Sequence, residues 1–243
     1  MWRHSQVLLL LLLLLSSSLA QRDPLRRQSD CPNEARPHSR PYMAALLDSQ
    51  NDHTCGGFLV GRQWVMTSAR CESVDTVFLG AHDSEYEFHS VARVYQHPEF
   101  ISENSTFPND ILLLKLRSKV RLNENIRILP LPTSSKDLSE GTPCSVAGWN
   151  SNGKDCALRL HEANASIYDR SECRKFYPEI DYGKICAGER EDSCQLFDQG
   201  EKGDPLVCNG VAHGILSYSN PCPPAVYTRI SKYLPWIKET MAK

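Results

Sequence analysis

The stretch CGGFLVGRQWVMTSARC, residues 55–71, contains two short apolar runs, 57–60 and 64–67, on either side of a polar turn. Short apolar runs bounded by turn residues are typical of β-strands. Similar stretches recur along the chain, at residues 42–47, 76–79, 111–116, 144–149 and 206–217. The sequence therefore predicts an all-β fold built from many short strands.

Two segments depart from this pattern. At the C-terminus, Tyr233, Trp236, Ile237 and Met241 recur at helical spacing and predict a helix that packs on the body of the protein. The central segment 129–138 is rich in proline and serine, which favours a linker between two halves.

The first 20 residues have the features of a signal peptide. Arg3 and His4 precede an unbroken apolar run at 7–15, which leads to the small-x-small motif at 18–20. No later segment reaches the roughly 18 apolar residues of a transmembrane helix. We expect a secreted protein without a membrane span, with storage in secretory granules as the alternative, in which 21–28 is a short pro-like segment.

Composition narrows the classes of function. The formal net charge is −2, and loss of Arg3 with the signal leaves 26 basic residues against 29 acidic ones. Binding of nucleic acid through bulk positive charge is therefore not indicated, although a local basic patch at Arg22, Arg26 and Arg27 stays open.

All ten cysteines lie beyond the signal peptide. An even number in an exported chain predicts five disulfides. A zinc site is the weaker alternative, because the close Cys or His pairs of structural zinc sites do not repeat. Two sequons, at Asn104 and Asn164, predict exposed asparagines for glycosylation, and an unoccupied sequon is the alternative.

Seven motifs occur in the order in which one family has them. They are RPYMA at 40–44, CGGFLV at 55–60, WVMTSARC at 64–71, NDILLLKL at 109–116, VAGW at 146–149, DSCQ at 192–195 and GDPLVC at 203–208. The chain thereby resembles the chymotrypsin-like (trypsin-like) serine protease family over nearly all of residues 29–243. RPYMA and AHGILSYS, 212–219, are similar in particular to the leukocyte-granule, azurocidin-like branch and to complement factor D.

This resemblance implies two six-stranded antiparallel β-barrels, at about 29–133 and about 134–230, followed by a C-terminal helix at about 231–243. Any active site would lie in the cleft between the barrels. The resemblance also implies four disulfides: Cys55–Cys71, Cys144–Cys208, Cys173–Cys186 and Cys194–Cys222. It leaves Cys31 and Cys156, which we expect to form the fifth.

The family cleaves peptide bonds with a serine nucleophile, a histidine base and an aspartate that orients the histidine. Arg70 stands where the family has the histidine, and a guanidinium keeps its proton at any working pH. Asp110 matches the aspartate and is expected to pair with Arg70, or to survive without a role.

Lys202 stands at the serine in the motif GEKGDP, 200–205, and a different local alignment puts Gly203 there. Neither residue has a hydroxyl. A lysine nucleophile needs a strongly lowered pKa, and no base remains beside it.

Positions that the family uses for activation and for the oxyanion hole also differ. Ser29 begins the segment that matches the terminus exposed by cleavage, and this segment lacks its apolar residues. Glu201 replaces the aspartate that the terminus contacts, and the loop before Gly200 is longer than in the family by about four residues. His53 matches a histidine that holds this acid in granule-branch zymogens, so Glu201 is its candidate partner; an ordinary surface histidine is the alternative.

Asp192 matches the aspartate that gives trypsin its preference for Arg and Lys. Ser217, Ser219 and Ala225 are the other pocket positions, and Ser219 and Ala225 replace glycines that keep the pocket open. We expect a narrowed pocket that Lys202 or Arg70 could fill.

The sequence-based interpretation is a secreted serine protease homologue that is not an enzyme. It would bind an extracellular or granule protein in innate immunity or in the control of extracellular proteolysis. The alternatives are a decoy that captures protease inhibitors or substrates through Asp192, and an active serine-type endopeptidase with an unconventional site. A monomer without a metal, a cofactor or a nucleic acid partner is expected.

Overall fold

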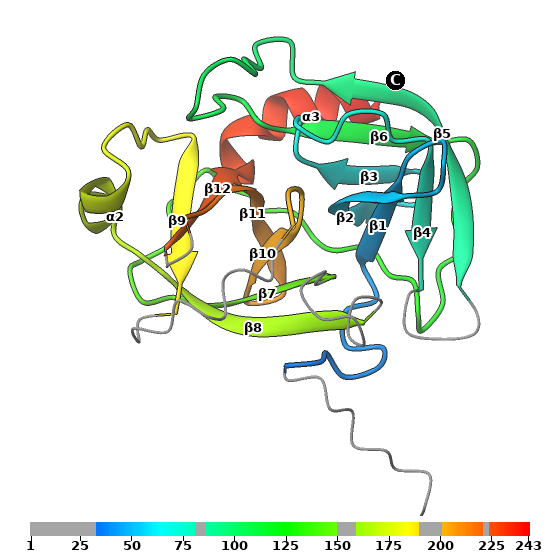
Figure 1. Ribbon diagram of the computed structural model, residues 1–243, viewed down its shortest axis with the longest axis horizontal. Coiled ribbons are helices and arrows are strands. Elements are labelled where there is room, and N and C mark those ends of the chain that lie inside the picture. The colour runs from blue at the N-terminus through cyan, green and yellow to red at the C-terminus, as the bar shows by residue number, and fades with distance from the viewer. Residues whose placement is uncertain (1–32, 81–85, 150–158, 190–200, 221–223) are drawn as a thin grey trace, which may run out of the picture. The chain divides into compact units, whose positions relative to one another are not determined.

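The computed structural model describes residues 33–80, 86–149, 159–189, 201–220 and 224–243. The described part of the chain contains two closed antiparallel barrels of six strands each (Figure 1). The predicted all-β fold with two six-stranded barrels and a C-terminal helix is confirmed. None of the helices in the described ranges is long and apolar enough to span a membrane.

The first barrel has the strand order β1-β2-β3-β6-β5-β4. Its strands are β1 (Met43–Leu47), β2 (His53–Gly61), β3 (Trp64–Thr67), β4 (Thr76–Leu79), β5 (Glu87–Gln96) and β6 (Leu112–Leu116). Leucine and valine side chains from β2, β3, β4 and β6 fill its interior. Their alternation along the strands directs the apolar set inward, as the pleat requires.

The second barrel has the strand order β10-β11-β12-β9-β8-β7. Its strands are β7 (Pro143–Trp149), β8 (Leu160–Ile167), β9 (Lys184–Gly188), β10 (Pro205–Cys208), β11 (Val211–Tyr218) and β12 (Ala225–Arg229). The short helix α2 (Arg170–Phe176) connects β8 to β9. The stretch 206–217, predicted as one strand, is two strands joined at Asn209 and Gly210, which have φ values of 52° and 75°. Asn-Gly favours such a two-residue hairpin turn.

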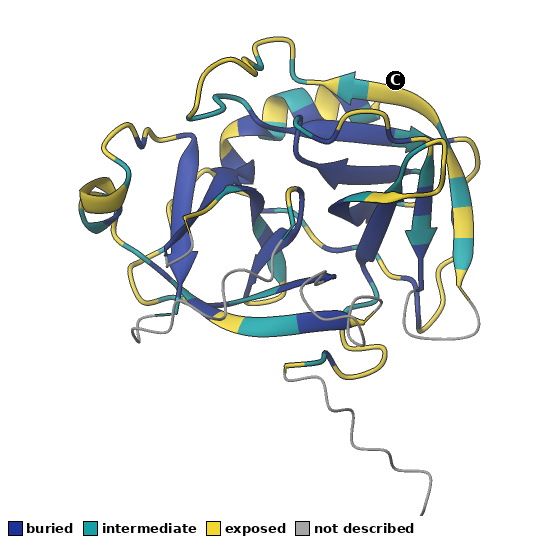
Figure 2. Cartoon of the chain, viewed as in Figure 1, coloured by how far each residue is buried: buried dark blue, intermediate teal, exposed yellow. Residues whose placement is uncertain are grey.

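A further apolar cluster contains residues of both barrels, including Phe58 and Met66 of the first barrel and Trp149 and Ile215 of the second. The burial colouring shows most strands of both barrels largely buried, whereas β5 and much of α2 are exposed or partly exposed (Figure 2). The apolar contact between the barrels is therefore continuous with the protein's core.

The segment between the barrels is hydrogen-bonded to both of them. The N–H of Leu129 donates to the carbonyl of Leu59 in β2 at 2.8 Å, and the carbonyl of Pro130 accepts from the N–H of Ala212 in β11 at 2.9 Å. Consecutive residues of the segment thus contact different barrels.

The C-terminal helix α3 (Leu234–Met241) follows the 3-10 turn η2 (Ile230–Tyr233). A proline in its first turn suits a helix start, because proline has no N–H to leave unsatisfied. The rings of Tyr233 and Trp236 lie 5.3 and 5.1 Å from that of His97, directly after β5. The helix therefore packs against the first barrel.

Three of the disulfides implied by the resemblance are present: Cys55–Cys71, Cys144–Cys208 and Cys173–Cys186. The expected pairs Cys194–Cys222 and Cys31–Cys156 lie outside the described residues, as do the signal peptide, the pro-like segment and Ser29.

Candidate functional site

Arg70 lies on the turn after β3, next to the disulfide that joins Cys71 to Cys55 of β2. Its partly buried guanidinium is fixed by two contacts. Nη1 donates to the carbonyl of Ser217 at 2.5 Å, and Cζ lies 3.8 Å from the centre of the Phe107 ring. A hydrogen bond from a cation and a cation–π contact both orient this side chain.

Asp110 is fully buried shortly before β6, and both of its carboxylate oxygens are occupied. Oδ1 accepts from the Ser68 hydroxyl at 2.6 Å and from the Arg70 backbone N–H at 3.3 Å, and Oδ2 accepts from the Ser217 hydroxyl at 2.5 Å. The expected ion pair between Asp110 and the Arg70 side chain is therefore wrong. The two hydroxyls satisfy the carboxylate, and the guanidinium donates to a backbone carbonyl instead.

Lys184, the first residue of β9, was not singled out by the sequence analysis. Its side chain is buried, and Nζ donates to the Phe107 carbonyl at 2.8 Å, the Ser217 hydroxyl at 3.1 Å and the Thr228 hydroxyl at 3.3 Å. Burial lowers the pKa of Lys184 to about 8, and the charge of Asp110 opposes this shift. Lys184, Ser217 and Asp110 thus form one buried chain of hydrogen bonds.

Lys202 and Gly203 have opposite surroundings. Lys202 is exposed, and its carbonyl accepts from the N–H of Gly56 at 3.0 Å and lies 3.6 Å from Sγ of Cys71, the residue after Arg70. Gly203 is buried with φ of 97°, and a Cβ there would lie 2.1 Å from both the Gly56 carbonyl oxygen and Oγ1 of Thr67. Only Lys202 of these two therefore has room for a side chain.

His53 and the two acids Glu201 and Asp204, which lie on either side of Lys202 in the sequence, form a cluster of titratable side chains. Nε2 of His53 lies 3.0 Å from the Cys55 carbonyl and 3.1 Å from Oε2 of Glu201, and the backbone N–H of Glu201 donates to Oδ2 of Asp204 at 2.6 Å. The structure thus brings His53 to the partner considered from the sequence.

Burial disfavours the ionised forms of the three side chains in this cluster. Burial lowers the pKa of His53 and raises that of Glu201 to about 7. Burial, followed by the charge of Glu201, raises the pKa of Asp204 well above its usual value. Desolvation therefore favours the neutral forms, and the contact of His53 with Glu201 has little ion-pair character near neutral pH.

The expected pocket residues are not all lining positions. Ser217 is fully buried and its hydroxyl is bonded to Asp110, so it does not line an open pocket. Ala225 is buried in β12 opposite Ala187 of β9, whereas Ser219 is exposed beyond the end of β11. Asp192 and Gly200 lie outside the described residues.

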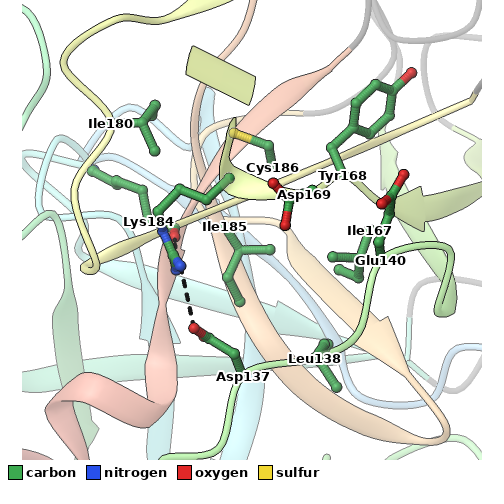
Figure 3. A pocket seen from close by; sticks show the side chains of 11 residues that line it. Asp137, Leu138, Glu140, Ile167, Tyr168, Asp169, Ile180, Lys184, Ile185 and Cys186 are labelled. Carbon is green, nitrogen blue, oxygen red and sulfur yellow. Dashed lines mark hydrogen bonds and ion pairs between the residues drawn. The ribbon is translucent and has the colours of Figure 1, made fainter. Parts of the chain in front are cut away.

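A separate cavity of about 110 Å³ lies in the second barrel, between β8, α2, β9 and the segment 137–140 (Figure 3). Asp137 on its wall pairs with Arg170 at 3.2 Å and with Arg229 at 2.9 Å. Asp137 is thus already paired with two arginines, whereas the Arg70 guanidinium has no carboxylate partner in the described part of the chain, so the Arg70 region is the better candidate site.

The chain is similar to known serine proteases over most of its length. The family model described as Trypsin matches residues 31–237. Human cathepsin G is 39% identical over 223 residues, covering 86% of this chain and 85% of its own, and bovine duodenase-1 is 41% identical, covering 87% and 88%. Among solved structures, neuropsin, a serine protease expressed in the limbic system of mouse brain, has a TM-score of 0.75 at 35% identity, covering 86% of this chain and 98% of its own.

These similarities contradict the prediction that the chain is not an enzyme. The relatives are granule proteases such as cathepsin G, and the similar fold of neuropsin is that of a serine protease. The prediction was wrong because it took substitutions at the base, the nucleophile, the activation terminus and the aspartate that this terminus contacts to decide the class of the whole protein, although the surrounding framework is retained.

Proposed function

Because the chain belongs to the trypsin family of serine proteases, we propose that it uses the cleft between its barrels to bind a macromolecular partner. The observation that carries this proposal is the pair of cationic side chains, Arg70 and Lys202, at the positions that match the family's active site. Arg70 is oriented by Ser217 and Phe107, and exposed Lys202 is held through its backbone. A fixed guanidinium is suited to recognition through directional hydrogen bonds.

The site of action that we propose is extracellular or within secretory granules. Disulfides persist in oxidising compartments, and the N-terminal 20 residues have the pattern of a signal peptide. Cathepsin G and sheep mast cell protease 3 are among the similar proteins, which favours a role in innate immunity or in the control of extracellular proteolysis. An azurocidin-like or factor D-like placement and a monomeric state are parts of this proposal.

Glycosylation at the two sequons fits the same compartment. Asn104 and Asn164 are both exposed, the first in the loop before Phe107 and the second on β8. A polar, solvent-facing asparagine is the type of site that accepts a glycan in an exported protein.

Peptide-bond hydrolysis is the second candidate function, and membership of a protease family favours it. Asp110 is buried and hydrogen-bonded in the manner of an orienting carboxylate. A guanidinium is not a general base and an ammonium has no hydroxyl, so hydrolysis at this site would require another proton acceptor and another nucleophile.

One experiment measures both functions. The purified protein is immobilised and exposed to secretory-granule extract or plasma, alongside the double variant Arg70→Gln/Lys202→Gln and the control Arg117→Gln. Arg117 is exposed and follows β6, at the opposite end of that strand from Asp110. We expect one saturable partner that the double variant loses and the control retains.

Hydrolysis is followed in the same preparations with a serine-directed phosphonate and with arginine-containing peptides. Equal capture by all three proteins would overturn cleft recognition. Turnover of peptides that the substitutions at positions 70 and 202 abolish would establish hydrolysis as the function of the cleft.

A further inference from the structure

Arg70 is unusual among the arginines of this protein. In the described ranges, four arginines are not fully exposed, and three of them pair with a carboxylate: Arg40 with Glu162 at 2.9 Å, Arg170 with Asp137 at 3.2 Å and Arg229 with the same Asp137 at 2.9 Å. The Arg70 guanidinium instead contacts a backbone carbonyl and an aromatic ring. Among the residues that the structure describes, it is thus partly desolvated without an acidic partner.

Asp110 accepts from the backbone N–H of Arg70, but it is not free to serve as a partner for the guanidinium. Asp110 accepts from two hydroxyls, and the Ser217 hydroxyl links it to the ammonium of Lys184. Asp110 thereby has its own buried cation. Its carboxylate would have to give up these hydrogen bonds to reach the guanidinium, which costs the desolvation of each group left unpaired.

Exposed Lys202 adds a second positive charge next to Arg70 in the fold. Its carbonyl lies 3.6 Å from Sγ of Cys71, the residue after Arg70, and the Lys202 side chain makes no ion pair within the described part of the chain. Lys184 compensates the buried carboxylate of Asp110 through the Ser217 hydroxyl. Arg70 and Lys202 are thus two cations that have no carboxylate partner within the described part of the chain.

We propose that Arg70, assisted by Lys202, binds a carboxylate group of the partner polypeptide. With Nη1 on Ser217 and the guanidinium plane against Phe107, the remaining N–H groups have a fixed direction. A planar carboxylate matches that fork, as it does for the other three partly buried arginines. The polypeptide origin of the carboxylate rests on the proposed function, whereas the anion site itself does not.

The test follows the Nε–H signals of ¹⁵N-labelled arginine by NMR while sodium acetate, and then acetyl-Gly-Asp-Gly-amide, is added to the full protein. The Arg70 signal is assigned from its loss in Arg70→Gln. We expect a saturable shift of the Arg70 signal with both probes. The three arginines already paired with carboxylates serve as internal controls and should not move.

Two matched comparisons complete the test. The neutral peptide acetyl-Gly-Asn-Gly-amide should bind at least about tenfold more weakly than the Asp peptide. The substitution Lys202→Gln should weaken binding of the Asp peptide by a few-fold. An Arg70 shift no larger than that of exposed Arg127, or equal binding of the Asp and Asn peptides, would overturn the anion site. Failure to capture a macromolecular partner would instead count against the proposed function, because acetate binding does not depend on it.

Discussion

The buried ammonium of Lys184 and the buried carboxylate of Asp110 are joined through a single hydroxyl, that of Ser217. The hydroxyl donates to Asp110 at 2.5 Å and accepts from Lys184 at 3.1 Å. A buried carboxylate is costly unless a cation compensates for it. In this protein that cation comes from the second barrel, whereas Asp110 lies at the edge of the first, so the charge pair also links the two barrels.

Removing the charge of Lys184 should strongly destabilise the protein. We expect Lys184→Met to lower the free energy of unfolding by about 3–5 kcal/mol, because Asp110 is left without a compensating cation. The double variant Lys184→Met/Asp110→Asn should recover part of this loss. Urea denaturation measures both effects, with Lys175→Met on the exposed face of α2 as the control. Strictly additive effects of the two substitutions would show that Lys184 and Asp110 are not coupled.

Glu201 should make stability depend on pH. Its folded-state pKa of about 7 lies above the reference value of 4.5, so folding takes up a proton between these values. The contribution of Glu201 to stability is therefore greatest below about pH 4.5 and is lost as pH rises through about 7. We expect the free energy of unfolding of Glu201→Gln to exceed that of the unsubstituted protein by on the order of 3 kcal/mol at pH 7.5. At pH 4.5 the two free energies should differ little. Glu179→Gln, at an exposed position, is the control in the denaturation series; a pH-independent difference would refute the shift.

Gly203 should tolerate no side chain. An added Cβ would meet the Gly56 carbonyl oxygen and Thr67 Oγ1 at 2.1 Å, at a φ of 97° that L-residues rarely adopt. We expect Gly203→Ala to cost more than about 3 kcal/mol of stability. Gly210→Ala is the matched control, because Gly210 has a φ of 75° with open space around it, and it should cost about 1 kcal/mol. Similar losses for the two variants would show that crowding does not exclude a side chain at 203.

The position of Asp110 also predicts how a histidine at 70 would behave. In Arg70→His/Lys202→Ser, the imidazole and the hydroxyl should act as a unit with Asp110 and hydrolyse amide substrates at least about 100-fold faster than either single variant. Adding Asp110→Asn should remove most of that gain, because the imidazole then loses its orienting acceptor. Rates are measured with fluorogenic peptides. A double variant no faster than the single variants would mean that the remaining cleft does not support this chemistry.

Short apolar runs located much of the fold, but they missed strands of other composition. β3 and β4 lie where the sequence predicts them, because their apolar residues are bounded by turns. β5 was missed, since its ten residues are almost all exposed or partly exposed and show no apolar alternation. The hairpin between β10 and β11 was read as one strand, although Asn209-Gly210 is a turn signal.

The candidate site was only partly predictable for a similar reason. The resemblance to the family's motifs located Arg70, Asp110 and Lys202, and it suggested the contact of His53 with Glu201. It did not indicate Lys184, because a single lysine at the start of an apolar strand is ordinarily solvent-facing. Nor did it indicate that Ser68 and Ser217 would satisfy Asp110, since hydroxyl directions depend on how separate strands meet.

The hydrogen bonds of Leu129 and Pro130 have a consequence for how a partner can enter. Adjacent backbone groups fasten the connecting segment to Leu59 on one side and to Ala212 on the other. A hinge needs residues whose backbone torsions are free to change, and hydrogen bonds restrain the backbone of Leu129 and Pro130. The connecting segment therefore ties the two barrels together, and we expect their spacing to stay the same when a partner binds.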